Sequence, residues 1–406
     1  MHRTSRVRWL VVALWTVSIF VAIPFMRALQ TAFTRHFPRE WIGYGVIMAA
    51  VLAAMLAAIA LARARRADPL SLVVVAGCGL GFVAWTAALW GEPVEAVHFV
   101  QYGTLGALLV WALRPAMPDV GVHLVATIAA ATVGVADEFV QWLTPRRYWD
   151  LRDVVINAGA AALVQPAAWR LAPPAVPGLG RRSARWTCRL AAALALLLAV
   201  SVSMTPQRLE RLANLLPSLE YLTRIDHPLA EYGHRHVVPG LGVFKSRFTL
   251  AELEALDRTR ADEVARILDR YPAGHYQAFL NDVRPGSDPF VYEVRVHLFS
   301  RDANLAEALQ LPEGTPERRR KMTVAEREHR LLESFFGRTV AASRLATPPE
   351  VAALLAAEAD PGMEFVSRAG SHLVTALPET GLRLGLLGIA GALLITDRRL
   401  GRRQPP

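Results

Sequence analysis

Long apolar runs dominate two parts of the chain. Runs of about 16 to 23 residues recur through residues 9–204, and one more lies at 382–396. Because about 20 helical residues span the hydrocarbon core of a bilayer, each run has roughly the length of a transmembrane helix. The pattern predicts an all-α polytopic membrane bundle and excludes a purely soluble enzyme, a collagen-like fibre and a disordered chain.

We expect about eight transmembrane helices. The last run has about 15 apolar residues, which is short for a span. Basic residues precede the first run, but its apolar part is longer than the core of a usual signal peptide, so we interpret it as an uncleaved anchor. Trp residues near most span ends support the boundaries, since aromatic rings prefer the headgroup level, although packing explains any single one equally well. The expected spans are 9–25, 41–62, 70–90, 94–113, 120–142, 153–169, 186–204 and 382–396.

Residues 205–380 have a different character, because charged residues become frequent and long apolar runs are absent. A segment of this length can bury a core of its own. Capping-box patterns at Thr249-Leu-Ala-Glu252 and Thr323-Val-Ala-Glu326 predict two helices, which end near Tyr271 and Gly337. Residues 290–298 alternate and predict a strand with one buried face, and 339–345 and 363–373 are weaker strands. We therefore predict an inserted α+β soluble domain between a membrane domain, 1–204, and a final span with a basic tail, 381–406.

The net charge of +10 is carried by Arg residues at the ends of the apolar runs. That placement is typical of topology signals, and it does not indicate a nucleic-acid partner. With the N-terminus inside, 16 Arg residues fall on the inner connections and six on the short outer ones. The bias predicts a multi-pass protein of the bacterial cell (inner) membrane, with both termini cytoplasmic and residues 205–380 outside.

Redox and metal chemistry have little support in the sequence. The only cysteines, Cys78 and Cys188, lie inside apolar runs, so a disulfide framework is excluded. No phosphate-binding glycine loop or nucleophile elbow is present, and we expect no cofactor. Imidazole and carboxylate groups, which are usual metal ligands, gather in one stretch, but their spacing matches no well-known metal motif. We interpret this stretch as a polar loop, with metal binding as the alternative: Asp226, His227, Glu231, His234 and His236.

Polar side chains gather at one end of the fourth, fifth and sixth expected spans. An ionic residue at a helix centre in lipid costs about 2.5 to 3.5 kcal/mol, so such residues need an explanation. His98 and Tyr102 are four residues apart and share a helix face, as do Glu138 and Gln141, which are three apart. The alternating direction of successive spans brings these groups to the outer end. The candidate binding residues are His98, Tyr102, Glu138, Gln141, Arg147, Asp153 and Asn157.

The turn between the fifth and sixth spans carries Arg146, Arg147 and Arg152 on the side where the positive-inside rule expects few. A guanidinium group can bind a carboxylate in bidentate fashion or hold a phosphate. Asp153 and Asn157 follow on one face of the sixth span. The set predicts a site for a polar or anionic molecule at the outer leaflet. The alternative is a structural clamp, in which Arg147 pairs with Glu138 or Asp153 and no ligand binds.

The same residues resemble the signature of the VanZ-like membrane family. The run Glu138-x-x-Gln141, Pro145-Arg146-Arg147, Asp150-x-x-Asp153, Asn157-x-Gly159 is similar to the family's Glu/Gln pair, Pro-x-Arg turn and Asp-x-x-x-Asn-x-x-Gly-like stretch. His98-Phe99-x-x-Tyr102 is similar to an upstream family pattern. The resemblance covers about residues 70–170. Val94 and Glu95 stand where many relatives have an Asp-Lys pair, so the local charge differs from theirs.

The resemblance implies a role in the cell envelope. The family's namesake is associated with low-level resistance to the glycopeptide teicoplanin, and most relatives have no established activity. The partners we expect are membrane lipids, a lipid-linked envelope precursor, and a protein bound through residues 205–380. Whether the chain is an enzyme stays open.

Two alternatives belong to other classes of protein. In a membrane-embedded hydrolase or transferase acting on a lipid-linked substrate, Glu138 or Asp153 is the general base, His98 is the acid and Arg147 holds a phosphate. In a structural scaffold, the membrane part only carries the outer domain.

Overall fold

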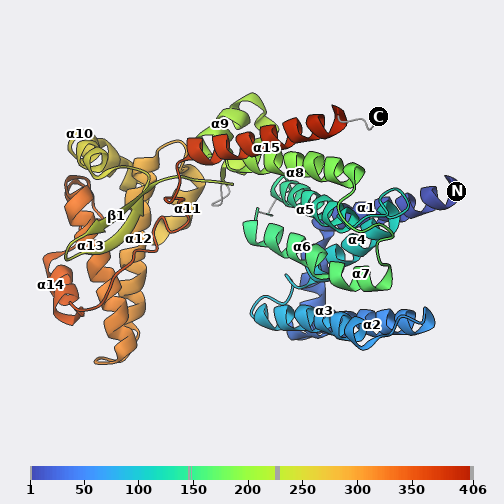
Figure 1. Cartoon of the computed structure of the whole chain (residues 1–406). Coiled ribbons are helices and arrows are strands. Elements are labelled where there is room, and N and C mark those ends of the chain that lie inside the picture. Colours follow the sequence, from blue (N-terminus) through green and yellow to red (C-terminus); the bar gives the residue numbers. More distant parts are fainter. Residues whose placement is uncertain (1, 145–146, 148, 225–228, 403–406) are drawn as a thin grey trace. The chain divides into compact units, whose positions relative to one another are not determined.

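The computed structural model describes residues 2–144, 147, 149–224 and 229–402 (Figure 1). The chain divides into two compact units. Unit 1 comprises Met1–Val200 and Arg383–Pro406, and unit 2 comprises Ser201–Leu382. Fifteen α-helices and one two-stranded sheet form the regular structure of the described residues, together with two short 3₁₀ helices.

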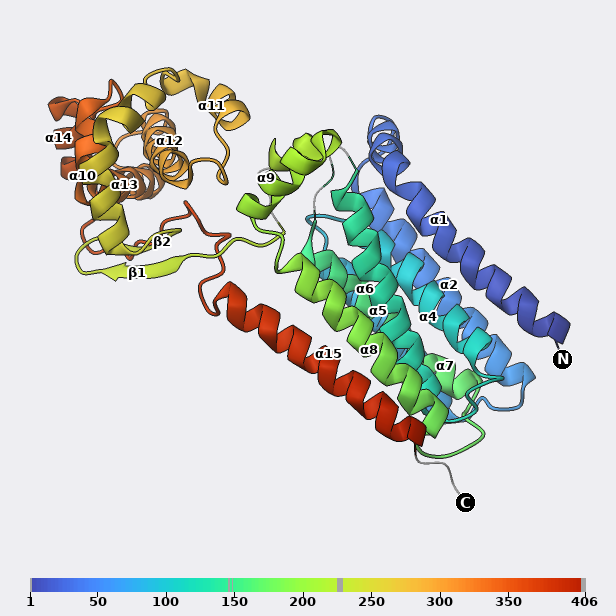
Figure 2. The ribbon, with the colours of Figure 1, turned by 90° about the horizontal axis from the view of Figure 1, so that it is seen from above.

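Unit 1 is a helical bundle in which α4 packs against α1, α2, α5, α6 and α7 (Figure 2). Small residues allow this close packing, since a Cβ added at Gly106 would lie 3.1 Å from the Cα of Ala161. The returning helix α15 lies along α8, where Asp397 binds Arg185 (2.8 Å) and Arg189 (3.0 Å). The helices of unit 1 are α1 (His2–Thr34), α2 (Glu40–Arg63), α3 (Pro69–Ala88), α4 (Val97–Leu113), α5 (Gly121–Trp142), α6 (Leu151–Leu163), α7 (Gln165–Leu171), α8 (Arg181–Ser201) and α15 (Glu379–Arg402).

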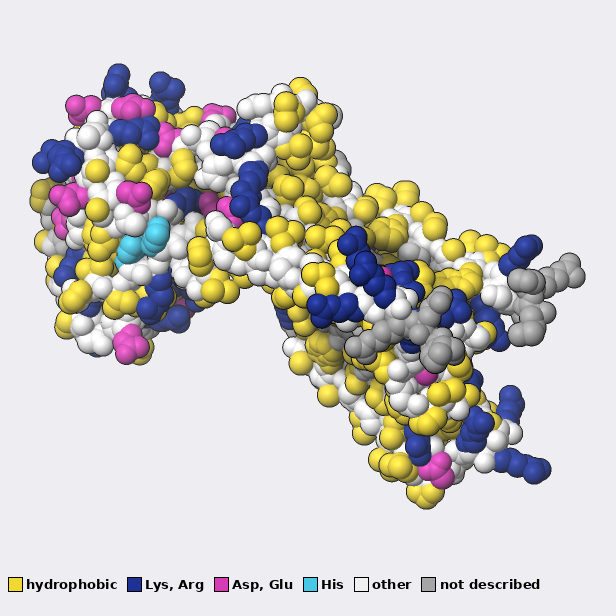
Figure 3. Space-filling view, turned by 45° about the horizontal axis from the view of Figure 1, so that its top comes forward, with side chains coloured by type: hydrophobic (Ala, Val, Ile, Leu, Met, Phe, Trp, Pro, Cys, Tyr) yellow, Lys and Arg dark blue, Asp and Glu magenta, His cyan; other side chains and the backbone are white. Residues whose placement is uncertain are grey.

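Six helices in the described residues are long and apolar enough to cross a bilayer: α1, α2, α3, α5, α8 and α15. In α2 the most apolar window has a mean hydropathy of 2.6, yet only 11% of it is buried within the chain. Hydrophobic side chains consequently cover much of the visible surface of unit 1 (Figure 3), and large ones such as Leu14, Met48 and Val73 are 61–70% exposed. Long helices with exposed apolar side chains suit a bilayer, because a helix satisfies its own backbone hydrogen bonds in lipid. Unit 1 therefore has the properties of a multi-pass membrane protein.

The structure does not confirm a count of eight spans. The fourth expected span is α4, with 17 residues, and the sixth is divided between α6, with 13 residues, and α7, with seven. Pro166 lies in the first turn of α7 and has no N–H to continue the hydrogen bonds of α6, so the helix is interrupted there. The last expected span is longer than predicted, since α15 has 24 residues.

The tryptophans near the span ends divide into two kinds. Trp41 is 56% exposed and Trp169 is 41% exposed, as expected for rings at the headgroup level. Trp142 is only 4% exposed and contacts Phe139 with a ring separation of 6.5 Å. Packing therefore explains Trp142, and membrane anchoring remains the interpretation for the exposed rings.

Unit 2 is mainly helical. The strands β1 (His234–Val238) and β2 (Gly242–Ser246) pair antiparallel, with His236 opposite Phe244. Helices α10, α12 and α13 pack on one another around an apolar core that includes Phe244, Leu298 and Leu331. The predicted α+β domain is thus helical with one small sheet. Its helices are α9 (Pro206–Leu215), η1 (Pro217–Arg224), α10 (Leu250–Leu268), η2 (Ala273–His275), α11 (Tyr276–Asp282), α12 (Pro289–Leu309), α13 (Pro316–Ala342) and α14 (Pro349–Glu358).

The strand predicted for residues 290–298 is wrong, because these residues belong to α12. Asp288 caps the helix by accepting a hydrogen bond from the Val291 N–H (3.2 Å), and Pro289 occupies the first turn. Arg295 and His297 are buried as completely as the apolar residues beside them. Residues 290–298 are buried on all sides and have no solvent-facing stripe, so their sequence does not show the period of 3.6.

The first capping box is confirmed and the second is wrong. Thr249 Oγ1 accepts from the Glu252 N–H (3.3 Å), and the Thr249 N–H donates to Glu252 Oε2 (2.8 Å). Thr323 instead lies inside α13, which begins with a Pro directly after its N-cap, Thr315. The Thr323 hydroxyl donates to the Arg319 carbonyl (2.7 Å), a bond typical of a helix interior.

The predicted end of that helix at Gly337 coincides with a kink in α13. Phe336 has non-helical angles (φ −135°, ψ 20°), and the helix then continues to Ala342. The weak strand predicted from 339 therefore begins in a helix. Residues 363–373 form no named strand, and Val366 joins the sheet only through an isolated bridge to Val243.

Candidate functional site

Three helices of unit 1 bring the predicted site residues to one end of the bundle. The start of α4, the end of α5 and the start of α6 meet there, and each of these helices packs against the other two (Figure 2). Asp150 fixes the start of α6, because its side chain accepts from the Arg152 N–H (2.7 Å). Pro145, Arg146 and Tyr148 of the turn lie outside the described residues.

His98 joins α4 to α6. Its Nδ1 lies 2.8 Å from Asn157 Oδ1, and its Nε2 lies 3.7 Å from Asp153 Oδ2. Asn157 is fully buried and also lies against α5, where a Cβ added at Gly134 would come within 2.8 Å of the Asn157 Cβ. Three of the predicted residues therefore form one connected group.

Tyr102 joins α4 to α5. Its hydroxyl donates to Asp137 Oδ2 (2.9 Å), and both side chains are buried. The rings of His98 and Tyr102 are stacked with centroids 6.2 Å apart, as their spacing of four residues predicted. Asp137 was not among the predicted site residues, although it precedes Gln141 by four positions and the same spacing rule could have included it.

Glu138 anchors the turn that follows α5. Gln141 Nε2 donates to Glu138 Oε1 (2.7 Å), and the Asp150 backbone N–H donates to Glu138 Oε2 (3.1 Å). The guanidinium of Arg147 donates to Gln141 Oε1, so Arg147 reaches Glu138 through the amide of Gln141. This differs from the predicted clamp, in which Arg147 was expected to bind a carboxylate directly.

The second arginine of the turn is also engaged. Arg152 Nη1 lies 3.2 Å from both carboxylate oxygens of Glu95, which precedes α4. Glu95 is one of the positions where this chain departs from the family pattern. The pair links the start of α6 to the residues before α4.

A cavity of about 50 Å³ adjoins these groups, between α1, α4 and α5. A buried water occupies about 10–15 Å³ by the same measure, so the space holds a few water-sized groups. His98, Gln141 and Arg147 line the cavity. The other predicted residues contact its lining: Asp153 and Asn157 contact His98, Glu138 contacts Gln141, and Tyr102 contacts Asp137. Residues that the sequence did not predict also line the cavity: Ile19, Ile23, Met26, Gln30, Val94, Val97, Gln101 and Asp137.

Three carboxyl groups, those of Asp137, Glu138 and Asp153, lie together with Arg147 among the described residues of this site. Asp137 Oδ1 and Asp153 Oδ1 are buried and have no hydrogen-bond partner among the described residues, and the same holds for Asn157 Nδ2. Buried acceptors without a donor are costly, by about 1–3 kcal/mol each. Hydroxyl or ammonium donors would satisfy the two oxygens, whereas the oxygens of a phosphate would only add further acceptors. We call the following set the polar cluster: His98, Tyr102, Asp137, Glu138, Gln141, Arg147, Asp153 and Asn157.

The candidate metal loop of unit 2 is partly described. Asp226 and His227 lie outside the described residues. Glu231 binds Arg247 Nε (2.5 Å) and His372 Nε2 (2.7 Å). Burial raises the pKa of Glu231, but these two partners outweigh it and hold the pKa below its usual value. Within the described part of the chain, no group of three or more His, Cys, Asp or Glu side chains is arranged to hold a metal ion.

No protein-family model, curated protein or solved structure matches the chain. The case for a function therefore depends on the polar cluster itself and on the sequence pattern that resembles the VanZ-like family.

Proposed function

We propose that the chain is a VanZ-like integral membrane protein of the cell envelope, and that its polar cluster binds a polar group of an envelope or lipid-linked molecule at the outer leaflet. The observation that carries the proposal is Asp137 Oδ1, a buried carboxylate oxygen without a partner among the described residues, on a residue that lines a cavity. A hydroxyl or ammonium donor from a ligand would satisfy this oxygen.

The size of the cavity limits what enters it. At about 50 Å³ it admits one small functional group, so the rest of the molecule would remain in the lipid or headgroup layer. The excess of carboxylates favours a neutral or cationic group over an anionic one. A glycan hydroxyl of a lipid-linked envelope precursor has the required chemistry, and this class of ligand would account for a link to glycopeptide sensitivity.

The proposed orientation follows from the distribution of arginines. With both termini in the cytoplasm of a bacterial cell, the polar cluster faces the outer leaflet and unit 2 is extracytoplasmic. Unit 2 would then be available to a protein partner in the envelope.

The test compares Asp137→Asn and His98→Ala with Gln165→Ala in the full-length protein. Gln165 is a matched control, since it forms a buried polar pair with His123 (2.9 Å) but lines neither the cavity nor the polar cluster. A hydrogen bond to a charged group contributes about 1.5–3 kcal/mol, so loss of the Asp137 carboxylate should weaken binding of a lipid-linked disaccharide precursor by about ten- to a hundredfold.

Teicoplanin sensitivity of cells expressing the same variants gives a second readout. We expect Asp137→Asn and His98→Ala to behave like the deletion, and Gln165→Ala to behave like wild type. Unchanged binding and unchanged sensitivity in both cluster variants would refute the proposal and favour the structural clamp.

One observation favours the enzymatic alternative as the second candidate. His98 lines the cavity and its Nε2 lies 3.7 Å from Asp153 Oδ2, an arrangement that general acid–base catalysis can use. Glu138 is a poor base in comparison, because both of its oxygens accept hydrogen bonds. Hydrolysis of the same lipid-linked precursor that disappears in His98→Gln would support catalysis, and binding without turnover would exclude it for that substrate.

A further inference from the structure

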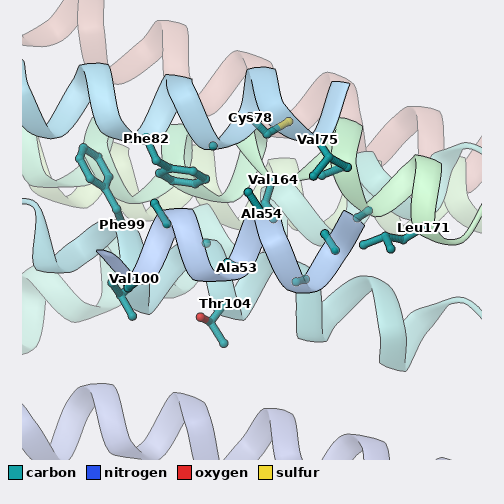
Figure 4. Close-up of a pocket in the computed structure, with 18 of the residues that line it drawn as sticks. Ala53, Ala54, Val75, Cys78, Phe82, Phe99, Val100, Thr104, Val164 and Leu171 are labelled. Atoms are coloured by element: carbon teal, nitrogen blue, oxygen red, sulfur yellow. The ribbon is translucent and has the colours of Figure 1, made fainter. Parts of the chain in front are cut away.

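An apolar groove of about 310 Å³ lies in unit 1 between α2, α3, α4 and α7 (Figure 4). It shares no lining residue with the cavity of the polar cluster. Thr104 supplies its only hydroxyl, and the rest of the lining is apolar, with Ala53, Val75, Phe99 and Leu171 among the residues that face it. In a membrane, a groove of this character takes a hydrocarbon chain.

The groove is long enough to hold most of one acyl chain. Its lining on α2 runs from Val46 to Ala57, which at 1.5 Å per residue is about 16 Å. These residues occupy the middle of α2, six residues from each end. One leaflet of a hydrocarbon core of about 30 Å is about 15 Å thick, so the groove has the length of an acyl chain in one leaflet.

A basic basin lies beyond one end of the groove. Arg65, Arg66, Ser71 and Arg170 line it, and α3 and α7 contribute residues to both the basin and the groove. Ser71 precedes the groove residue Val75 by one helical turn, and Arg170 is the neighbour of Leu171.

The basin has an excess of positive charge. Its one carboxylate, Asp68, is already engaged by Arg170 (3.1 Å) and by the Ser71 hydroxyl (2.6 Å). Hydrogen bonds from Ser71 hold the pKa of Asp68 below its usual value, so the carboxylate is ionised and compensates Arg170. Arg65 and Arg66 remain as exposed arginines that line the basin.

The backbone of Arg65 gives an independent indication. Its φ is +54°, the left-handed region that favours glycine, and it is the only non-glycine residue with a positive φ in the described chain. Arg65 ends α2 in a Schellman motif, with the Arg66 N–H bonded to the Leu61 carbonyl (2.8 Å) and the Arg65 N–H bonded to the Ala62 carbonyl (3.0 Å). An arginine in a position suited to glycine points to a use for its side chain.

We propose that the groove and the basin together bind one anionic phospholipid, with an acyl chain in the groove and the phosphate on Arg65 and Arg66. Basic pockets between transmembrane helices are a recognised setting for anionic headgroups. The site is separate from the polar cluster, and it does not depend on the proposed envelope ligand.

The test is native mass spectrometry of the full-length protein, with phosphatidylglycerol and phosphatidylcholine added in equal amounts. Wild type should retain one phosphatidylglycerol in preference to phosphatidylcholine. Each basic residue near an anionic lipid contributes about a fivefold change in affinity, so Arg65→Gln with Arg66→Gln should weaken phosphatidylglycerol binding by about 25-fold. Arg182→Gln, which changes an exposed arginine outside the basin, is the matched control and should have no effect.

Two further variants test the groove and the Arg65 backbone separately. Ala53→Phe should fill the groove and weaken both lipids alike. Arg65→Gly should weaken phosphatidylglycerol binding while making the protein more resistant to unfolding, because glycine suits the φ of +54°. Equal retention of the two lipids by wild type would overturn the proposal, as would full phosphatidylglycerol binding in the double variant or in Ala53→Phe. Displacement of the lipid by inorganic phosphate alone would also overturn it and assign the basin to a soluble anion instead.

Discussion

Gly159 is the position at which the packing of unit 1 can be tested most sharply. A Cβ at this position would lie 2.4 Å from Trp85 Cη2 and 2.9 Å from Cζ3, both of which belong to a rigid ring. Overpacking of this kind costs about 1–3 kcal/mol, whereas alanine gains about 0.5–1 kcal/mol over glycine inside a helix. We therefore expect Gly159→Ala to lower the free energy of unfolding by about 1–2 kcal/mol.

The matched control is Gly77→Ala on α3, where no atom lies within 4 Å of the added Cβ. Because alanine favours a helix more than glycine does and meets no neighbouring atom here, this variant should increase the free energy of unfolding by about 0.5–1 kcal/mol. Titration of the full-length protein with a denaturing detergent, followed by circular dichroism, measures both changes. In a Trp85→Phe background the shorter ring should remove most of the cost of Gly159→Ala. Equal stability of the two glycine variants would refute the proposed packing, as would a cost that Trp85→Phe does not reduce.

Three further predictions concern buried polar groups. Tyr102→Phe should lower the free energy of unfolding by about 1.5–3 kcal/mol, because Asp137 loses the hydroxyl that donates a hydrogen bond to it at 2.9 Å. A double-mutant cycle with Asp137→Asn should show coupling between the two residues, and strictly additive effects would contradict the hydrogen bond. Arg247→Met should cost about 3–5 kcal/mol, because Glu293 would be buried without a counter-charge and Glu231 would keep only His372. Limited proteolysis of unit 2 should show this loss, with the exposed Arg258→Met as control, and equal resistance of the two variants would count against it. Burial disfavours protonation of His297, but the carboxylate of Glu328 at 2.7 Å outweighs this effect and raises the pKa of His297. The protonated His297 therefore stabilises the fold. This stabilisation is fully present below about pH 6.5 and is lost as the pH rises through the folded-state pKa. Hydrogen exchange of α12 peptides should therefore speed up with rising pH more in wild type than in His297→Gln, once the intrinsic exchange rates are subtracted, and identical profiles would exclude the effect.

Local rules were sufficient for part of the site. The faces shared by His98 with Tyr102 and by Glu138 with Gln141 follow from helical spacing, and the three helix ends meet because successive spans reverse direction. The sequence could also have predicted close helix packing at Gly159, since a small residue beside a polar face allows neighbouring helices to approach.

Other features depend on contacts between distant residues. The link from Arg147 to Glu138 through Gln141 could not be chosen from spacing, because several carboxylates were equally near in sequence. The cavity wall from α1 consists largely of apolar residues such as Ile19 and Ile23, which carry no signal of their own. The error at 290–298 has a similar origin, since this part of α12 is buried within unit 2 and tertiary burial overrides its pattern.

The central claim is that unit 1 crosses a membrane with the polar cluster at the extracytoplasmic end. Cysteine labelling in intact cells with a membrane-impermeant maleimide tests it most directly, after Cys78 and Cys188 have been replaced by alanine. Leu143→Cys, in the exposed turn after α5, should react in intact cells, and Ala64→Cys, at the end of α2, should react only after the cells are permeabilised. The reverse pattern, or equal labelling of both positions in intact cells, would contradict the orientation and with it the assignment of the polar cluster to the outer leaflet.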